Sequence, residues 1–341
     1  MTAKMTAFDF QKQAQEHYSK APVIILGSGA SAAFGLPSMG TLATYLIENT
    51  ELNALSEEDN VAWLEFSQLL TDGVDLETAL HRVHLSDLLT QSVVLKTWEL
   101  INPADLAVFE QSMKSRDLFP LGSLLRRMFQ STLKEIDIIT TNYDRLAEYA
   151  CEQENIYHYS GFSHGFSRNI AAPNQITVDR KVNVWKVHGS LDWHKYPSGP
   201  TFGLANTSPL PDGSFPQIIT PGNEKYRLTH LEPFRTILGA SDNAIQNANS
   251  FLCVGFGFND QHIQEKLVQK CVGEKSCLTL ITRSLSDAAR DFLIDGDVDN
   301  FLAIERGATD HQSVVYSSML SEPMNVDLDC WSMAGYLSVI I

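Results

Sequence analysis

The fold class is decided by the stretch VIILGSGAS, residues 23–31. Four consecutive branched or aliphatic residues are typical of a strand that is buried on both faces. The small residues that follow are typical of a tight turn leading into a helix, and glycine there lets the backbone approach a pyrophosphate closely. Such a turn also occurs for packing alone, so its meaning depends on the rest of the chain.

Four further apolar runs have the same character, and each ends where Gly, Asn or His appears. They cover residues 136–140, 182–187, 251–254 and 277–282. Continuous apolar runs of this length predict parallel strands covered by helices on both sides. We therefore expect a doubly wound, mostly parallel, Rossmann-like α/β sheet.

The stretches between these runs predict one α/β domain over residues 1–341 that carries additions. Helical spacing at Met39–Glu48, Asn60–Leu70, Leu76–His84 and Leu121–Leu133 indicates a helical lobe inserted over residues 40–135, with loops near Thr71–Gly73 and Asn102–Pro103. Six of the thirteen prolines lie between Pro197 and Gly222, so residues 191–250 are expected to be irregular.

Composition excludes several classes of partner. With 25 basic and 41 acidic residues the formal charge is −16, which opposes direct nucleic-acid binding, although local backbone N–H groups can still hold a dinucleotide. No stretch resembles a secretory leader or a membrane span, so we expect a soluble, cytoplasmic protein without a membrane partner. The five cysteines lack zinc spacing, and no metal is expected.

Polar clusters follow the predicted strands. Asn142 comes after the second strand, His188 after the third, and the glycine-rich residues 255–260 after the fourth. Ligands of open α/β sheets bind outside the carboxyl ends of the strands, so these clusters and residues 27–31 are expected along one edge. A nucleoside-triphosphate loop is disfavoured, because no Lys or Arg occurs between Ala21 and Glu51.

In order along the chain, these motifs resemble those of sirtuin-like proteins. They are GSGAS at 27–31, GLP at 35–37, TTNYD at 140–144, HGSLDW at 188–193 and GFGFND at 255–260. The resemblance spans roughly residues 21–283 and is closest to the bacterial antiphage branch. It implies a sirtuin-type fold and hydrolysis of NAD to nicotinamide and ADP-ribose.

The resemblance assigns roles by motif position. Asn142 would hold the attacking water or a ribose hydroxyl, and neutral His188 would accept a proton, a step in which histidine is effective near neutral pH. NAD-binding residues carried over from the motifs are Gly27, Ser28, Gly29, Ala30, Ser31, Pro37, Thr141, Asp144, Gly255, Phe256, Gly257 and Asn259. The alternative interpretations are that Asn142 caps a helix starting at Tyr143 and that His188 is a structural strand-end residue.

A departure from the deacylase branch of sirtuins weakens the deacylase interpretation. Residues 190–250 contain no cysteine, so we expect the irregular region 191–250 to replace the four-cysteine zinc module. NAD-dependent protein deacylation and a non-catalytic NAD or ADP-ribose sensor remain alternatives to NAD hydrolysis. An NAD-depleting enzyme needs restraint, so we expect a homo-oligomer and, by resemblance, a HerA-type ATPase partner in antiviral defence.

Overall fold

A computed structural model describes residues 7–51, 56–220 and 230–341. Its central feature is a nine-stranded sheet in the order β13-β12-β11-β10-β9-β1-β2-β5-β3. The strands are β1 (Val23–Leu26), β2 (Glu135–Thr140), β3 (His158–Tyr159), β5 (Lys181–Lys186), β9 (Ser250–Val254), β10 (Cys277–Thr282), β11 (Phe301–Arg306), β12 (Ser313–Ser317) and β13 (Met324–Val326). All neighbours pair in parallel except β11 with β12 and β12 with β13.

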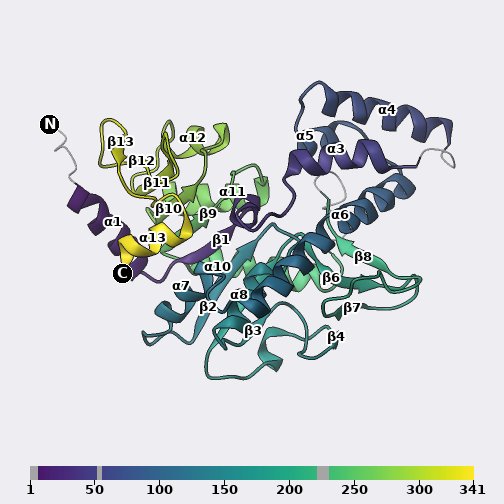
Figure 1. Cartoon of the computed structure of the whole chain (residues 1–341), viewed down its shortest axis with the longest axis horizontal. Helices are drawn as coiled ribbons and strands as arrows, with labels where there is room; N and C mark the ends of the chain where they lie inside the picture. The colour runs from purple at the N-terminus through teal and green to yellow at the C-terminus, as the bar shows by residue number, and fades with distance from the viewer. Residues whose placement is uncertain (1–6, 52–55, 221–229) are drawn as a thin grey trace.

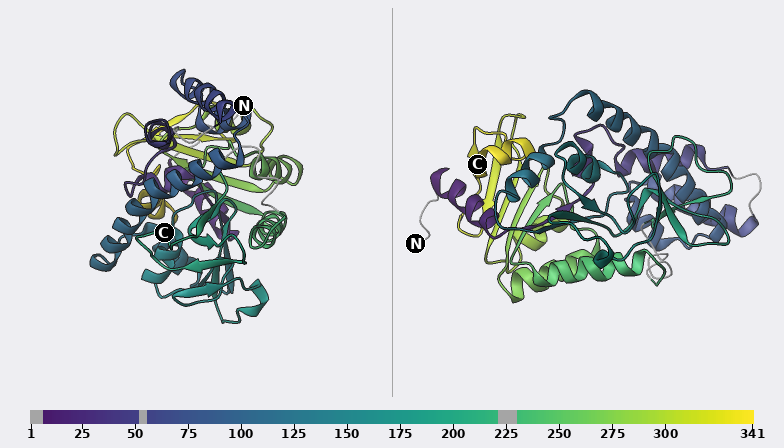
Figure 2. Two further views of the ribbon diagram at one scale, coloured as in Figure 1. Left: turned by 90° about the vertical axis from the view of Figure 1, so that its right-hand side faces the viewer. Right: turned by 90° about the horizontal axis from the view of Figure 1, so that it is seen from below.

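Helices cover both faces of this sheet, as the continuous apolar strands require. One face packs against α10 (Phe234–Asn247), α11 (Gln261–Val268) and α12 (Asp287–Leu293). The other packs against α1 (Ala7–Ser19), α7 (Pro120–Met128), α8 (Leu146–Gln153) and α13 (Met333–Ile340). Figure 2 shows α10 lying along one side of the sheet. The predicted doubly wound α/β fold is confirmed, and all five predicted strands are present.

The connection between β1 and β2 contains a separate helical lobe. It comprises α3 (Met39–Asn49), α4 (Glu57–Thr71), α5 (Leu76–Arg82) and α6 (Asp87–Lys114), and Figure 1 shows it projecting beyond the sheet. The lobe has its own apolar core, in which Trp63 and Phe66 of α4 are buried against α3, α5 and the start of α6. In contrast, α7 lies on the sheet.

The predicted loop at Asn102–Pro103 is wrong, because both residues lie inside the 28-residue helix α6. Proline in a helix interior removes one backbone hydrogen bond and costs about 3 kcal/mol. The flanking residues offset this cost through tertiary contacts: Ile101 is buried, and the Asn102 amide donates to the Thr207 carbonyl at 2.9 Å. Tertiary packing therefore overrides the local signal.

The region expected to be irregular contains regular structure. A second, four-stranded antiparallel sheet has the order β4-β7-β6-β8. Its strands are β4 (Ser167–Asn169), β6 (Gly189–Lys195), β7 (Thr201–Leu204) and β8 (Phe215–Ile218). The prolines lie mostly between or at the edge of these short strands, where a missing N–H group is tolerated. The region also includes α10.

Strand register fixes where the site lies. Leu26 is level with Thr140 on one side and with Val254 on the other, and Thr140 is level with Lys186. Four strands therefore end side by side. The chain moves from β1 toward β2 and β5 and later returns on the opposite side of β1 at β9, so the topological switch point lies between β1 and β9. Ligands of such sheets bind at this point.

Candidate active site

A cleft opens at the carboxyl ends of these four strands. The space between its walls, including the part open to solvent, is about 900 Å³. It is lined by Gly27, Ser28, Ser31, Leu36, Pro37, Met39, Glu77, Ile101, Thr141, Asn142, Tyr143, Asp144, His188, Phe256, Gly257, Asn259 and Asp260. Eleven of the fourteen residues predicted from the sequence are therefore in one cleft.

The other three predicted residues hold two loops together behind the cleft. The Gly27 N–H donates to the Val254 carbonyl at 3.0 Å, and the Gly29 N–H to the Gly255 carbonyl at 3.1 Å. A Cβ atom on Gly255 would lie 2.3 Å from the Ala30 nitrogen, and Gly255 has φ +56°. Gly29, Ala30 and Gly255 thus serve close backbone packing, while exposed Ser28 faces the cleft.

Asn142 is held rigidly by hydrogen bonds of its side chain. Its amide nitrogen donates to the Gly27 carbonyl at 2.8 Å and to the Ser31 hydroxyl at 2.9 Å. Both amide N–H groups are therefore used, and Oδ1 is the acceptor left for a ligand, since no hydrogen bond to it occurs among the described residues. Asn142 can therefore offer a ligand an acceptor but no amide N–H.

Helix capping does not explain Asn142. Helix α8 begins at Leu146, and the backbone N–H of Leu146 donates to Asp144 Oδ1 at 3.1 Å. Asp144, and not Asn142, therefore caps this helix. Asp144 Oδ2 accepts from the Ser31 hydroxyl at 2.6 Å, which completes a chain from Asn142 through Ser31 to Asp144. Burial raises the pKa of Asp144, whereas the nearby Lys186 ammonium and the Ser31 hydroxyl oppose that rise. This series of hydrogen bonds orients the Asn142 side-chain amide.

His188 is oriented by a carboxylate from the neighbouring loop. Its Nε2 lies 2.9 Å from Asp260 Oδ2, and both side chains are largely buried. Asp260 Oδ1 accepts from the Ile263 N–H at 3.1 Å and caps α11, so the carboxylate itself is fixed. With Nε2 protonated toward Asp260, Nδ1 of the neutral imidazole carries the lone pair. This arrangement of an acid behind a histidine is suited to general-base catalysis.

Backbone strain accompanies this loop. Phe258 is fully buried and has φ +59°, a left-handed conformation that a bulky residue rarely adopts. Its ring packs between Phe256 and Phe292 at centroid distances of 5.0 and 5.3 Å. Packing thus maintains a backbone conformation that brings Asn259 and Asp260 to the cleft.

Several cleft residues were not assigned a role from the sequence. Asp260 stands within the quoted GFGFND motif, but its contact with His188 depends on the strained turn. Glu77 and Ile101 come from the helical lobe, and they could not be predicted from the sequence because they lie far from the motifs along the chain. The lobe therefore forms one wall of the cleft.

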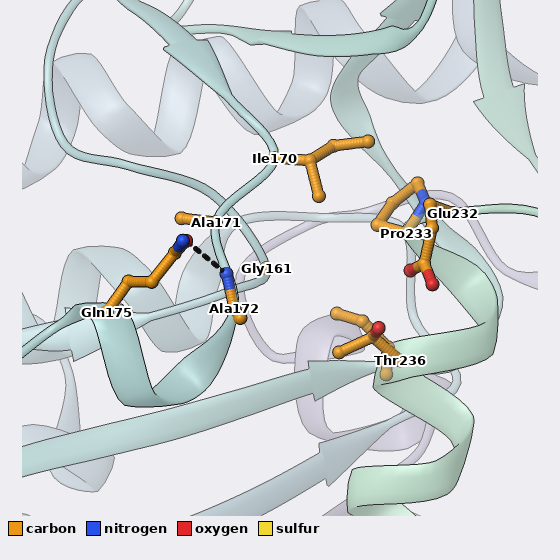
Figure 3. A pocket seen from close by; sticks show the side chains of 9 residues that line it. Gly161, Ile170, Ala171, Ala172, Gln175, Glu232, Pro233 and Thr236 are labelled. Atoms are coloured by element: carbon orange, nitrogen blue, oxygen red, sulfur yellow. Dashed lines mark hydrogen bonds between the residues drawn. The ribbon is translucent and has the colours of Figure 1, made fainter.

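A second hollow encloses less space, about 540 Å³ including the part open to solvent, and lies between the start of α10 and the loops after β3 and β4. Figure 3 shows Ile170, Ala171, Pro233 and Thr236 around it, together with the Glu232 carboxylate. Glu232 Oε1 is paired with Arg235 at 2.8 Å. None of the residues predicted for the site lines this hollow.

Among residues 7–51, 56–220 and 230–341, no group of three or more His, Cys, Asp or Glu side chains is arranged to hold a metal ion. In the same ranges, no helix has the length and apolar character needed to cross a bilayer.

Part of the chain is similar to a known protein family. Residues 137–276, less than half of the chain, match the family model described as SIR2-like domain. This SIR2-like segment includes Asn142, His188 and the motif 255–260, whereas residues 27–31 lie outside it. A search of curated proteins finds no match.

Solved structures that match this chain include Sir2 proteins. A triple mutant of a Sir2 homologue bound to 2′-O-acetyl ADP ribose is 16% identical, with a TM-score of 0.47, covering 87% of this chain and 90% of that one. A Sir2 homologue–NAD complex is 15% identical, with a TM-score of 0.42 and coverages of 89% and 90%. A Sir2 bound to a propionylated peptide is 14% identical, with a TM-score of 0.45 and coverages of 83% and 89%. At these values the chemistry of those proteins does not transfer to this chain.

Proposed function

We propose that this protein is an NAD+ glycohydrolase that cleaves NAD to nicotinamide and ADP-ribose. The observation that carries the proposal is the presence in one cleft of the Asn142 Oδ1 acceptor and the His188–Asp260 pair, beside the β1 glycine turn. The SIR2-like match over both candidate catalytic residues supports NAD as the substrate. No metal takes part in the proposed reaction.

The proposed chemistry is a displacement at the ribose carbon that bears nicotinamide. The bond from that carbon to the ring nitrogen breaks, and its electron pair returns to the ring, which leaves as neutral nicotinamide. Water adds to the oxocarbenium-like carbon, and His188 accepts the proton of the water before releasing it to solvent. The products are nicotinamide, ADP-ribose and one proton.

The individual residues have separate tasks in this proposal. Asn142 Oδ1 accepts a hydrogen bond from the attacking water or a ribose hydroxyl, and Asp260 stabilises the imidazolium that His188 becomes. Ser28 and the β1 turn face the pyrophosphate, and Phe256, Gly257 and Asn259 flank the adenosine half. Gly29, Ala30 and Gly255 act indirectly, by fixing the shape of the cradle.

The role in the cell is proposed from the motif resemblance. An enzyme that depletes NAD is suited to antiphage defence in the cytoplasm, where it must stay restrained until infection. We propose that the chain works as a homo-oligomer and is activated by a partner of the HerA-type ATPase class. Depletion of NAD in cells that express the chain, dependent on infection and on Asn142, tests this role.

The biochemical test is a product assay on NAD with no peptide present. The purified chain, alone and with the protein encoded next to it, is expected to release nicotinamide and ADP-ribose in equal amounts. Asn142→Ala and His188→Ala are expected to abolish release while retaining the unfolding midpoint of the wild type. Turnover only with an acyl-lysine peptide selects the deacylase, and nucleotide binding without turnover selects the sensor.

A further inference from the structure

Helix α6 joins the helical lobe to the site. At 28 residues it is about 42 Å long at ~1.5 Å per residue. Its first turns are buried in the lobe core through Leu89 and Val93. Its middle is buried in a different core, where Trp98 and Ile101 pack with Tyr143 and Leu191. Helix α6 therefore belongs both to the core of the helical lobe and to the core that contains Tyr143 and Leu191.

Asp105 of α6 holds the loop that carries Asn142. Its carboxylate accepts three hydrogen bonds from Arg145: from the backbone N–H at 2.7 Å, from Nε at 2.8 Å and from a terminal guanidinium nitrogen at 2.6 Å. The Tyr149 hydroxyl donates to it at 2.6 Å. The Asp105 side chain is completely buried and that of Arg145 is 4% exposed. Asn142 is three residues before Arg145.

Trp98 of the same helix holds the segment that follows His188. Its indole N–H donates to the Leu191 carbonyl at 2.7 Å, in a buried position. Leu191 is three residues after His188, and its own N–H donates to the Tyr143 carbonyl at 3.0 Å. The two segments that carry the candidate catalytic residues are thus bonded to each other and to one face of α6.

We propose that α6 is a positioning element for the reaction, in which Asp105 and Trp98 set the separation of Asn142 and His188. Neither side chain touches the cleft, so each acts through the backbone it holds. This inference rests on the proposed NAD hydrolysis. It extends that proposal, because a displacement of the helical lobe would then change the rate of the reaction.

The contacts favour positioning over stability alone. A buried ion pair is seldom a net source of stability compared with apolar residues of the same volume, whereas several charge-assisted hydrogen bonds from a planar guanidinium restrict geometry. Here Nε and a terminal nitrogen of Arg145 both bind one oxygen of Asp105, and the other oxygen binds the Arg145 backbone N–H, three residues after Asn142. A shift of about 1 Å between catalytic groups is enough to lower a rate roughly 10²-fold.

The test uses two variants that leave no unpaired buried charge. Asp105→Asn combined with Arg145→Met removes the ion pair, and the Asn carbonyl still accepts the backbone N–H of residue 145. Trp98→Phe keeps an aromatic ring in the core but removes the indole N–H and part of the ring volume. Lys270→Met is the matched control, since Lys270 is 4% exposed and bonded to the Gln246 carbonyl and Glu274 at the far end of α11.

For the double variant we expect kcat for NAD hydrolysis to fall about 10²-fold, with KM changed less than about threefold because no group facing the cleft is altered. Trp98→Phe should lower kcat by up to about tenfold, the effect of one hydrogen bond. Lys270→Met should keep wild-type kcat. Wild-type kcat in both α6 variants, or an equal loss in the control, overturns the inference.

Hydrogen exchange separates this inference from the proposed function. In the double variant, amides of residues 141–146 and 187–191 should exchange faster, while those of β10 and β11 keep wild-type protection. That result supports positioning even if the wild type does not hydrolyse NAD, in which case the proposed function alone fails. Uniform loss of protection across the sheet shows a general stability effect and contradicts the inference.

Discussion

Asp260→Asn is the substitution that examines the His188 arrangement most closely. Asp260 uses one oxygen to cap α11 through the Ile263 N–H and the other to bind His188 Nε2. In the variant, the amide oxygen must keep the cap, so the amide NH₂ faces Nε2. The imidazole can accept that hydrogen bond only with its proton on Nδ1, the nitrogen that is needed as the base.

The expected magnitudes for activity and stability differ sharply. Loss of a general base is worth about 10²- to 10⁴-fold in kcat, or about 3 to 5 kcal/mol of activation free energy. Asn caps a helix about as well as Asp, and the loss of one negative charge near the N-terminus of α11 costs only about 0.3–1 kcal/mol. The free energy of unfolding should therefore fall by less than about 1 kcal/mol.

Asp260→Ala is the comparison that makes this test specific. It removes the cap, which costs about 1 kcal/mol more of unfolding free energy, but it leaves His188 free to choose its tautomer. We expect Asp260→Ala to be less stable than Asp260→Asn and yet more active. Steady-state nicotinamide release ranks the two variants by activity, and urea unfolding ranks them by stability. An Asn variant as active as the wild type, or more active than the Ala variant, refutes the reasoning.

Three further substitutions probe the surroundings of the site. Ser31→Ala breaks the link between Asn142 and Asp144, and kcat should fall by up to about tenfold; nicotinamide release at saturating NAD checks this, and an unchanged kcat argues against the link. Gly255→Ala places a Cβ atom 2.3 Å from the Ala30 nitrogen; weaker ADP-ribose binding by calorimetry and a loss of about 1–3 kcal/mol in urea unfolding are expected, and wild-type values for both would contradict it. Burial lowers the pKa of His194 to about 4, so the unfolded chain binds the proton first as pH falls, and about 3 kcal/mol of stability should be lost between about pH 6.5 and pH 4. His194→Leu should reduce that loss, and an identical acid slope in both proteins would exclude this cause.

The strands were predictable because their apolar runs are continuous and end in distinctive residues. Residues 23–26 and 277–282 were located to the residue, and the other three runs to within one residue at each end. Parallel order then follows from the helical spacing of the connections. The meeting of Asn142 and His188 at one edge follows from the rule for carboxyl ends of strands, with no knowledge of side-chain positions.

Three features depended on long-range contacts and could not be predicted. Helix α6 continues through Pro103 because Asn102 and Asp105 bond to distant segments. The small sheet forms from strands of three to seven residues whose pairing has no strong local pattern. Asp260 reaches His188 through a turn that holds Phe258 at positive φ, and glycine would have been the expected residue there.

A crystal structure of the chain with ADP-ribose bound would show directly whether Asn142 and His188 meet the same nucleotide. We expect the pyrophosphate beside Ser28 and the β1 turn, with the terminal ribose between Asn142 Oδ1 and His188 Nδ1. A nucleotide bound elsewhere, such as beside Glu232 in the smaller hollow, would contradict it. So would a ribose that contacts neither Asn142 nor His188.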